Sequence, residues 1–113
     1  LNWQLRERGA TLQLCTQSAP DYQLYALPGG PPLRPAMVLA ESGQGQAIEV
    51  EVWSMPLAEL GSFVAGIPAP LGIGKVRLAD GRLCPGFICE QSGIRGATDI
   101  SHFGGWRAYL RSL

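Results

Sequence analysis

Strict alternation of apolar and polar residues marks several short stretches of this chain, and a period of two predicts β-strands. The clearest stretch is AIEVEVWSM, residues 47–55. Because successive side chains of a strand point to opposite faces, the isoleucine and valines share one face, whereas Glu49, Glu51 and Trp53 share the other. Two carboxylates are therefore expected side by side on this strand.

The same period predicts strands in the first third of the chain. Leu12 and Leu14 alternate with polar residues near the start. Residues 22–27 and 36–40 form two further apolar runs, separated by a Pro/Gly-dense loop at 28–35. Three strands are expected here, the second and third of them joined by this loop.

A hairpin is predicted in KVRLADGRLCPGFICE, residues 75–90. Asp80 and Gly81 lie between two alternating runs, and an Asp-Gly pair favours the tight turn of a hairpin. Pro85 has no N–H to donate to a strand ladder, which favours an edge position or a bulge for the second strand.

Helical spacing of apolar residues predicts short helices in three places. One covers the opening residues and ends at Gly9. A second begins with Pro56 and carries Leu57, Leu60 and Val64 on one face. The third lies at the end of the chain, with Asp99 or Ser101 as its cap. Its expected apolar stripe consists of Phe103, Trp106, Tyr109, Leu110 and Leu113.

Together these patterns predict six or so short strands, mostly antiparallel, with two or three small helices. The expected fold class is α+β, built on a small barrel-like sheet. At 113 residues the chain is long enough for one core and too short for two, so a single domain over 1–113 is expected.

Composition narrows the function classes. Nine basic and nine acidic residues cancel, which disfavours binding to nucleic acid or to an anionic membrane. The chain shows neither a run of eighteen apolar residues nor a charged leader before an apolar segment, so a cytoplasmic location is expected. Three cysteines and one histidine match no zinc spacing, and no metal or other cofactor is expected.

Five segments are more specific than their periodicity. In chain order they are LNWQLRERGA, YQLYALPG, AIEVEVWSMP, GSFVAGIPAPLGIGKVRLADGR and GATDISHFGGWRAYL. Their order and spacing resemble the C-terminal domain of allophanate hydrolase, over nearly the whole chain. IPAPLGIG at 67–74 and FGGWRAYL at 103–110 carry most of the resemblance, because they are long and composition alone does not produce them.

The resemblance implies a fold like that of the γ-glutamylcyclotransferases. It implies a parent protein in which an amidase domain hydrolyses allophanate during urea or triazine breakdown, and in which this domain decarboxylates the resulting N-carboxycarbamate. The implied partners are a small dicarboxylate-like substrate and the amidase domain, and a homo-oligomer stays open. Lys75 has no glycine- and serine-rich nucleophile loop beside it, so the chain is not itself the amidase.

Two departures from the family pattern temper this expectation. The resemblance implies a first strand and a histidine-containing loop before the segment that begins at Leu1, and the residues from Leu1 onward are expected to lack both. Ala65 precedes Gly66 where the cyclotransferases have their acid, so that activity is disfavoured. The chain alone is expected to be incomplete or inactive. The alternative is a non-catalytic module that stabilises or oligomerises the amidase domain.

Decarboxylation of an N-carboxylate needs a proton donor near the nitrogen and hydrogen-bond donors for the carboxylates. We expect a pocket between the strand end at 25–27, the Glu49 and Glu51 face, the 65–73 loop and the region 95–106. Glu51 is the expected proton donor, with a salt-bridged or solvated strand residue as the alternative.

The other candidate residues have defined roles in this hypothesis. Tyr25 is expected to hydrogen-bond the substrate, or else to be a core aromatic with a hydrated tip. Arg95 and Arg107 are expected to clamp a carboxylate, unless they only face solvent. Glu49 and Gln4 are further binding candidates. His102, the single histidine, is assigned to packing, because the first turn of a helix disfavours an imidazolium.

Overall fold

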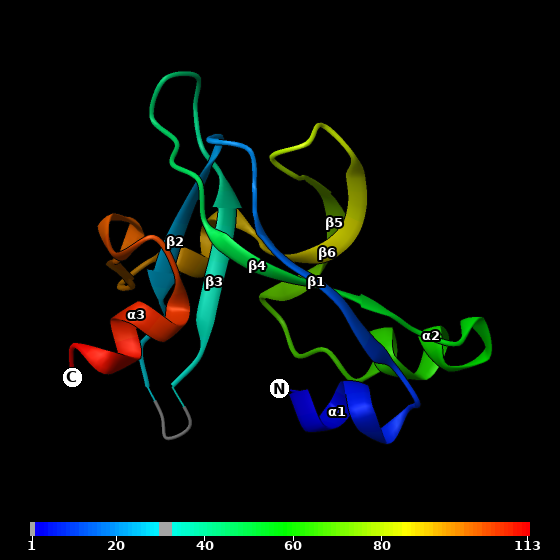
Figure 1. Cartoon of the computed structure of the whole chain (residues 1–113). Coiled ribbons are helices and arrows are strands. Elements are labelled where there is room, and N and C mark those ends of the chain that lie inside the picture. The colour runs from blue at the N-terminus through cyan, green and yellow to red at the C-terminus, as the bar shows by residue number, and fades with distance from the viewer. Residues whose placement is uncertain (1, 30–32) are drawn as a thin grey trace.

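The computed structural model describes residues 2–29 and 33–113. Within them, three α-helices and seven strands follow one another along the chain (Figure 1). They are α1 (Asn2–Glu7), β1 (Thr11–Gln17), β2 (Tyr22–Ala26), β3 (Pro35–Leu39), β4 (Glu49–Ser54), α2 (Leu57–Ala65), β5 (Leu71–Arg77), β6 (Leu83–Cys89), β7 (Thr98–Asp99) and α3 (Trp106–Arg111). Two short 3-10 turns, Gln91–Ile94 and Ser101–Phe103, precede β7 and α3.

The strands form three small antiparallel sheets: β1 with β4, β3 with β2 and β7, and β5 with β6. This confirms the α+β class and the antiparallel pairing. The structure has three open sheets where a single barrel-like sheet was predicted, because the chain changes direction at 18–21 and again at 40–48. Only isolated pairs, Ser18 with Leu78 and Tyr22 with Gln46, continue the pairing beyond the named strands.

Ser18 lies at the junction of the sheets and is completely buried. Its N–H donates to the Ile48 carbonyl at 2.8 Å. Its hydroxyl oxygen accepts from the Ile48 N–H at 3.0 Å, and the hydroxyl donates to the Ala19 carbonyl at 2.9 Å. A small polar side chain therefore satisfies backbone groups that neither neighbouring strand reaches.

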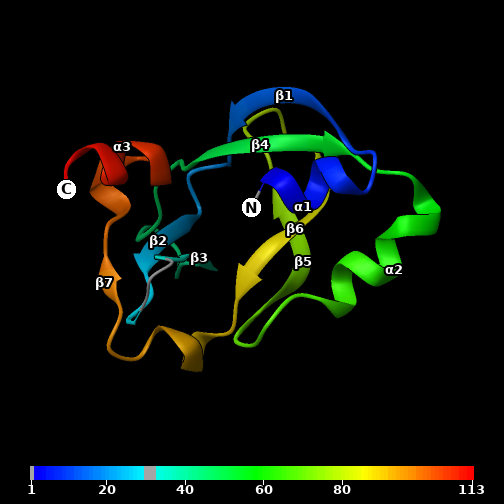
Figure 2. The ribbon, with the colours of Figure 1, turned by 90° about the horizontal axis from the view of Figure 1, so that it is seen from below.

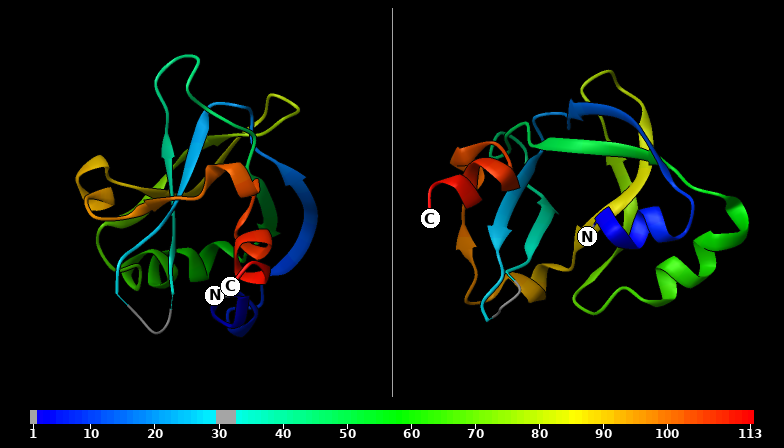
Figure 3. Two further views of the ribbon diagram at one scale, coloured as in Figure 1. Left: turned by 90° about the vertical axis from the view of Figure 1, so that its left-hand side faces the viewer. Right: turned by 60° about the horizontal axis from the view of Figure 1, so that its bottom comes forward.

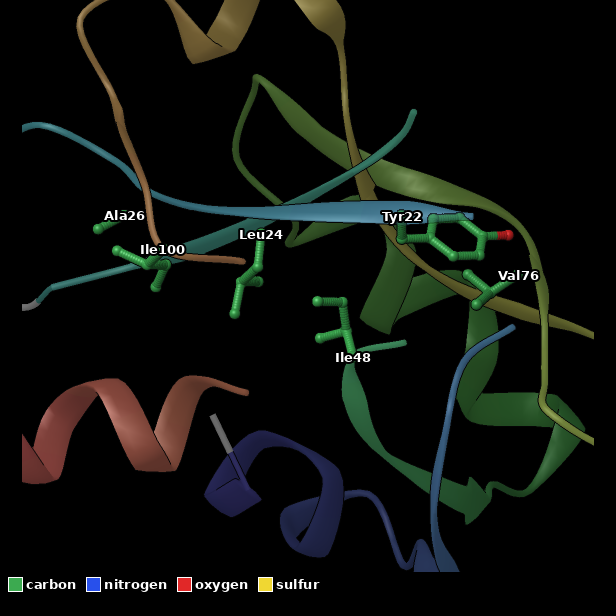
Figure 4. Packing of buried hydrophobic residues seen from close by; sticks show 6 residues of the cluster. All are labelled: Tyr22, Leu24, Ala26, Ile48, Val76 and Ile100. Atoms are coloured by element: carbon green, nitrogen blue, oxygen red, sulfur yellow. The ribbon is translucent and has the colours of Figure 1, made fainter. Parts of the chain in front are cut away.

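One buried cluster joins β2, β5 and the residues directly before β4 and the Ser101–Phe103 turn. Its members are Tyr22, Leu24, Ala26, Ile48, Val76 and Ile100, which converge between the sheets (Figure 4). The Tyr22 hydroxyl leaves this apolar cluster and accepts a hydrogen bond from the Arg77 N–H at 2.9 Å. Since β2 alternates buried Tyr22, Leu24 and Ala26 with half-buried residues, one of its faces belongs to the core.

The predicted hairpin is confirmed as β5 and β6, with Gly81 at a positive φ of 92° in the turn. Pro85 is tolerated opposite Lys75, since each strand of a two-stranded sheet has a free edge. β5 begins at Leu71, before the predicted run. Position 74 needs a glycine, because a Cβ atom there would collide with the Ile88 side chain. This glycine interrupts the alternation of apolar and polar residues in β5.

The last predicted helix is shorter than expected. Ser101–Phe103 form a separate 3-10 turn, Gly104 takes a left-handed conformation at φ 76°, and α3 begins only at Trp106. Phe103, Trp106 and Tyr109 pack against the core as predicted. The prediction was wrong for Leu110 and Leu113, which are exposed: Leu113 lies beyond the end of α3, and Leu110 lies in its last turn without joining the core cluster.

Helices α2 and α3 lie at opposite ends of the molecule, and α1 lies on the side of α2 (Figures 2 and 3). None of the helices in residues 2–29 and 33–113 is both long and apolar enough to span a membrane.

Candidate functional site

Two neighbouring hollows open on the polar face of β2. The larger, of about 380 Å³, is lined by Gln23, Gln44, Gln46, Asp99, Ser101 and His102. The second, of about 230 Å³, is lined by Gln23, Tyr25, Ala40, Glu41, Gln44, Gln91 and Ile94. Because they share Gln23 and Gln44, they form one surface, which we name the glutamine groove.

The strand period and one turn position the groove. Gln23 and Tyr25 lie two residues apart on β2, so both side chains point away from the core face. The Tyr25 hydroxyl donates to Gln23 Oε1 at 3.3 Å, and Gln23 Nε2 donates to the Gln44 carbonyl at 3.4 Å. Gln46 is held by backbone hydrogen bonds with Tyr22 in both directions. The strand and the 41–46 turn thus fix one wall.

The opposite wall is the turn that leads from β7 toward α3. Asp99 Oδ1 accepts hydrogen bonds from the Ser101 N–H at 2.9 Å and from the Ser101 hydroxyl at 2.6 Å. The Ser101 oxygen in turn accepts from the Leu24 N–H at 2.9 Å, which ties the turn to β2. Burial, and after it the charge of Asp99, raises the pKa of Tyr25 above its ordinary value. The Tyr25 hydroxyl therefore remains a hydrogen-bond donor near neutral pH.

His102 lies on this wall with an exposed imidazole that stacks on Phe103 at a centroid distance of 4.3 Å. The predicted location in the first turn of the terminal helix was wrong, because Gly104 and Gly105 separate His102 from α3. His102 therefore does not lie in the first turn of α3, and the helix dipole gives no reason to assign it to packing. The sequence signal for this residue is its place directly after Asp99-Ile100-Ser101 and two residues before the first of two glycines, Gly104.

Glu51 lies outside the glutamine groove. Its carboxylate accepts from Arg107 Nη2 at 2.6 Å through one oxygen and from Trp53 Nε1 at 3.1 Å through the other. The shared face of Glu51 and Trp53 is thereby confirmed. Arg6 of α1 lies over the Trp53 ring, 5.6 Å from its centroid. Glu51 thus takes the arrangement of a salt-bridged strand residue that connects β4 to α3.

The structure does not bring Glu51 and Tyr25 to one hollow. Tyr25 belongs to the three-stranded sheet and Glu51 to the β1–β4 pair, and neither described hollow includes a residue of β4 or of the 65–73 loop. The common pocket therefore stays a prediction, because strand alternation fixes which residues share a face and says nothing about what covers that face.

The remaining candidates also lie outside the groove. Glu49 is exposed at the start of β4, where its N–H donates to the Gly104 carbonyl at 2.7 Å. Gln4 is half-buried in α1, and its carbonyl accepts from Arg8 Nη1. Arg95 is exposed directly after the Gln91–Ile94 turn, and Arg107 is exposed apart from its ion pair.

The described residues contain no group of three or more His, Cys, Asp or Glu side chains placed to hold a metal ion. Cys15, Cys84 and Cys89 are free thiols and range from exposed to buried. The donors of the groove are instead amides, a phenol and an imidazole. Such groups form hydrogen bonds with a small polar molecule.

Comparisons with known proteins identify the family. A family model described as the allophanate hydrolase C-terminal domain matches residues 1–111. Urea amidolyase of Saccharomyces cerevisiae is 43% identical over 116 residues, an alignment that covers 100% of this chain and 6% of that protein. The solved allophanate hydrolase of Kluyveromyces lactis superposes with a TM-score of 0.94 at 40% identity, over 99% of this chain and 19% of that one.

A shorter relative shows the same fold. A solved uropathogenic E. coli-specific protein has a TM-score of 0.88 at 29% identity, and the match covers 100% of this chain and 86% of that one. This chain therefore spans a small part of the yeast proteins and most of the bacterial one. Because the family model matches from residue 1 to residue 111, the chain belongs to the allophanate hydrolase C-terminal domain family.

Proposed function

We propose that the chain serves as the C-terminal domain of an allophanate hydrolase in the release of nitrogen from urea, and that it assists the breakdown of N-carboxycarbamate after the amidase step. Family membership over the whole chain carries the proposal, since the matched relatives are named urea amidolyase and allophanate hydrolase. The glutamine groove is the proposed binding site.

The groove has the donors that such a substrate needs. The amide N–H groups of Gln44 and Gln46 and the His102 imidazole offer donors to carboxylate oxygens, and the Tyr25 hydroxyl, which donates to Gln23 Oε1 in this structure, can rotate toward a bound carboxylate. Asp99 and Glu41 also line the groove and their charges oppose a dianion, so the proposed binding relies on these neutral donors. We assign His102 and Tyr25 to substrate binding.

The reaction itself is a proton transfer followed by loss of CO2. A proton is delivered to the nitrogen, the carbon–nitrogen bond breaks, and its electron pair stays on nitrogen, which leaves carbamate. The resemblance implies that, in relatives, this proton comes from a histidine that precedes the matched segment. The residues of this chain would orient the dianion and hold its carboxylates apart, which lowers the barrier through positioning.

We also propose that residues 1–113 form one domain of the γ-glutamylcyclotransferase-like kind. The support is the buried cluster, to which β2, β5 and the residues before β4 and α3 all contribute. A core shared by two of the sheets and the residue before β4 stabilises these elements together, and neither two-stranded sheet is expected to be stable by itself.

Malonate tests the binding site, because it replaces the nitrogen of N-carboxycarbamate with a methylene group. We expect calorimetric titration of the complete two-domain enzyme to show saturable binding that His102→Ala weakens about tenfold, the loss of one charge-assisted hydrogen bond. The rate of CO2 release should fall with it, while the amide hydrolysis rate stays unchanged.

Glu51→Gln is the matched control, since Glu51 carries charge and lies outside the groove. Its malonate affinity should stay within about twofold of the wild type, a free-energy change of less than about 0.5 kcal/mol. Equal malonate affinity in the wild type and in His102→Ala would refute the assignment of the groove.

A non-catalytic module remains a second candidate function. The observation that favours it is the exposed apolar face of α2, which the groove does not involve.

A further inference from the structure

Asp99 contributes to the larger hollow of the glutamine groove and lies directly opposite a residue of the second. Its strand partner in the pairing of β7 with β2 is Tyr25, which lines the second hollow (Figure 2). Directly opposed residues of antiparallel strands have Cβ atoms about 4.5–5.5 Å apart and point to the same face. A ligand that spans the two hollows would therefore have its middle near the Asp99 carboxylate.

One oxygen of the Asp99 carboxylate is held in place, and the other is free to bind. Oδ1 accepts from the Ser101 N–H at 2.9 Å and from the Ser101 hydroxyl at 2.6 Å. Between them, the Ile100 N–H donates to the Leu24 carbonyl at 2.8 Å, which fixes the turn on β2. Among the residues that the structure describes, none donates a hydrogen bond to Oδ2. Because Asp99 is exposed in the hollow, Oδ2 can accept from a bound molecule.

The charge of Asp99 acts on the groups that face a ligand. Burial raises the pKa of Tyr25, and the charge of Asp99 raises it further. The same charge repels the carboxylates of a bound dianion. Asp99 therefore weakens the binding of N-carboxycarbamate itself, and any benefit from this carboxylate arises later in the reaction.

We propose that Asp99 faces the nitrogen of N-carboxycarbamate and stabilises it once it is protonated. This inference rests on the proposed function and deepens it. A general acid delivers a proton to the nitrogen, which becomes a positively charged NH2 group between two carboxylates. The carbon–nitrogen bond then breaks, its electron pair stays on nitrogen, and the products are CO2 and carbamate. Asp99 neither gains nor loses a proton in this step.

The electrostatic effect of Asp99 changes sign during this reaction. Before proton transfer it repels the two carboxylates of the substrate. After proton transfer it attracts the cationic nitrogen, and Oδ2 accepts a hydrogen bond from the new N–H. Only interactions that are stronger in the transition state than in the ground state accelerate a reaction, so this carboxylate raises the rate although it lowers the affinity.

Asp99→Asn in the complete two-domain enzyme separates affinity from rate. Asparagine keeps an Oδ1 acceptor for Ser101 and replaces the charged Oδ2 with an uncharged NH2 group. We expect the malonate affinity in calorimetric titration to rise about threefold, because the repulsion is removed. The rate of CO2 release from N-carboxycarbamate should fall about tenfold, because the cationic nitrogen loses its counter-charge.

Glu59→Gln is the matched control, since it removes one negative charge from an exposed position on α2, outside the groove. Both its malonate affinity and its rate of CO2 release should stay within about twofold of the wild type. A damaged turn in Asp99→Asn would weaken malonate binding, so a weaker affinity in that variant would show a merely structural role and overturn the proposal.

Biuret and malonamide test the position of Asp99 without the reaction. Both are uncharged diamides, and they differ in the central group, which is N–H in biuret and methylene in malonamide. We expect the wild type to bind biuret about fivefold more tightly than malonamide, because the Asp99 carboxylate accepts from the central N–H. Asp99→Asn should bind the two with equal affinity, since its NH2 group cannot accept that hydrogen bond.

The outcomes distinguish this proposal from the proposed function. Malonate binding that depends on His102, together with equal affinity of the wild type for biuret and malonamide, would overturn the role of Asp99 and leave the groove as the binding site. Unchanged CO2 release in Asp99→Asn would do the same. A wild type that binds neither malonate nor biuret would refute both proposals.

Discussion

Helices α2 and α3 come from the same kind of sequence signal and differ in what they bury. Each carries apolar residues at helical spacing and lies at one end of the molecule. In α3, Trp106 and Tyr109 pack against the core and against each other, with ring centroids 5.3 Å apart. In α2 only Phe63 is buried, and the apolar stripe of Leu57, Leu60 and Val64 is exposed to solvent.

The difference shows what an amphipathic pattern does and does not specify. The pattern specifies that a helix has an apolar face, because spacing is a local property of the chain. Which surface covers that face depends on residues far away in sequence. For α3 the covering surface belongs to this chain, whereas the apolar stripe of α2 is exposed to solvent among the residues that the structure describes.

Removing the half-buried Trp106 side chain, which packs α3 against the core, should have the largest effect on stability. Trp106→Ala is expected to lower the free energy of unfolding by about 2–3 kcal/mol, the lower part of the range for a large aromatic because Trp106 is half-buried. Urea denaturation of the chain measures the loss. Leu110→Ala on the same helix is the control and should cost less than about 0.5 kcal/mol, since Leu110 is exposed. Equal losses would remove the contrast between the buried and the exposed stripe.

Removing the hydrogen bond between Ser101 and the Leu24 N–H should have an intermediate effect on stability. Ser101→Ala leaves the buried Leu24 N–H without its acceptor, and we expect a loss of about 1–2 kcal/mol. Ser62→Ala on α2 removes an exposed hydrogen bond with Arg8, and it should cost much less. Thermal unfolding of both variants gives the comparison, and a larger loss for Ser62→Ala would reverse it.

Substitutions in the exposed apolar stripe of α2 should have the smallest effect on the free energy of unfolding. In the chain alone, Leu57→Gln is expected to change the free energy of unfolding by less than about 0.5 kcal/mol, because the side chain is already solvated. The same denaturation experiment checks this. A loss above about 1 kcal/mol would mean that Leu57 contacts the domain in solution, and the stripe would no longer be free for a partner.

Much of the fold follows from the sequence. The period of two in 47–55 predicted β4 and the common face of Glu51 and Trp53. Asp80-Gly81 predicted the β5–β6 hairpin. These features depend on neighbours in sequence. The division into three sheets does not follow in this way, because it depends on single pairs such as Ser18 with Leu78, which lie far apart along the chain.

The candidate site was less predictable than the fold. Tyr25 lines the glutamine groove, and its role toward a substrate stays a prediction, whereas the partner of Glu51 is Arg107, 56 residues later. An ion pair over that separation has no local pattern. His102 was assigned to packing from its place in a presumed helix, and the glycines that follow it change that place.

The glycine at 105 has its own tertiary reason. A Cβ atom there would lie 2.9 Å from the Glu49 Cβ atom, so the backbone of the turn approaches the start of β4 too closely for a side chain. The hydrogen bond from the Glu49 N–H to the Gly104 carbonyl depends on this approach. Sequence alone shows two adjacent glycines and not the strand that they accommodate.

The hydrogen bonds of Ser18 determine which positions of the domain tolerate an insertion. An epitope tag or a whole inserted domain between Asp80 and Gly81 would lengthen an exposed hairpin tip and leave every strand in place. The same insertion beside Ser18 would break its hydrogen bonds to the Ile48 backbone and its bridge to Leu78, which connect the β1–β4 and β5–β6 sheets. A reporter meant to follow this domain in its parent enzyme therefore belongs at the hairpin tip.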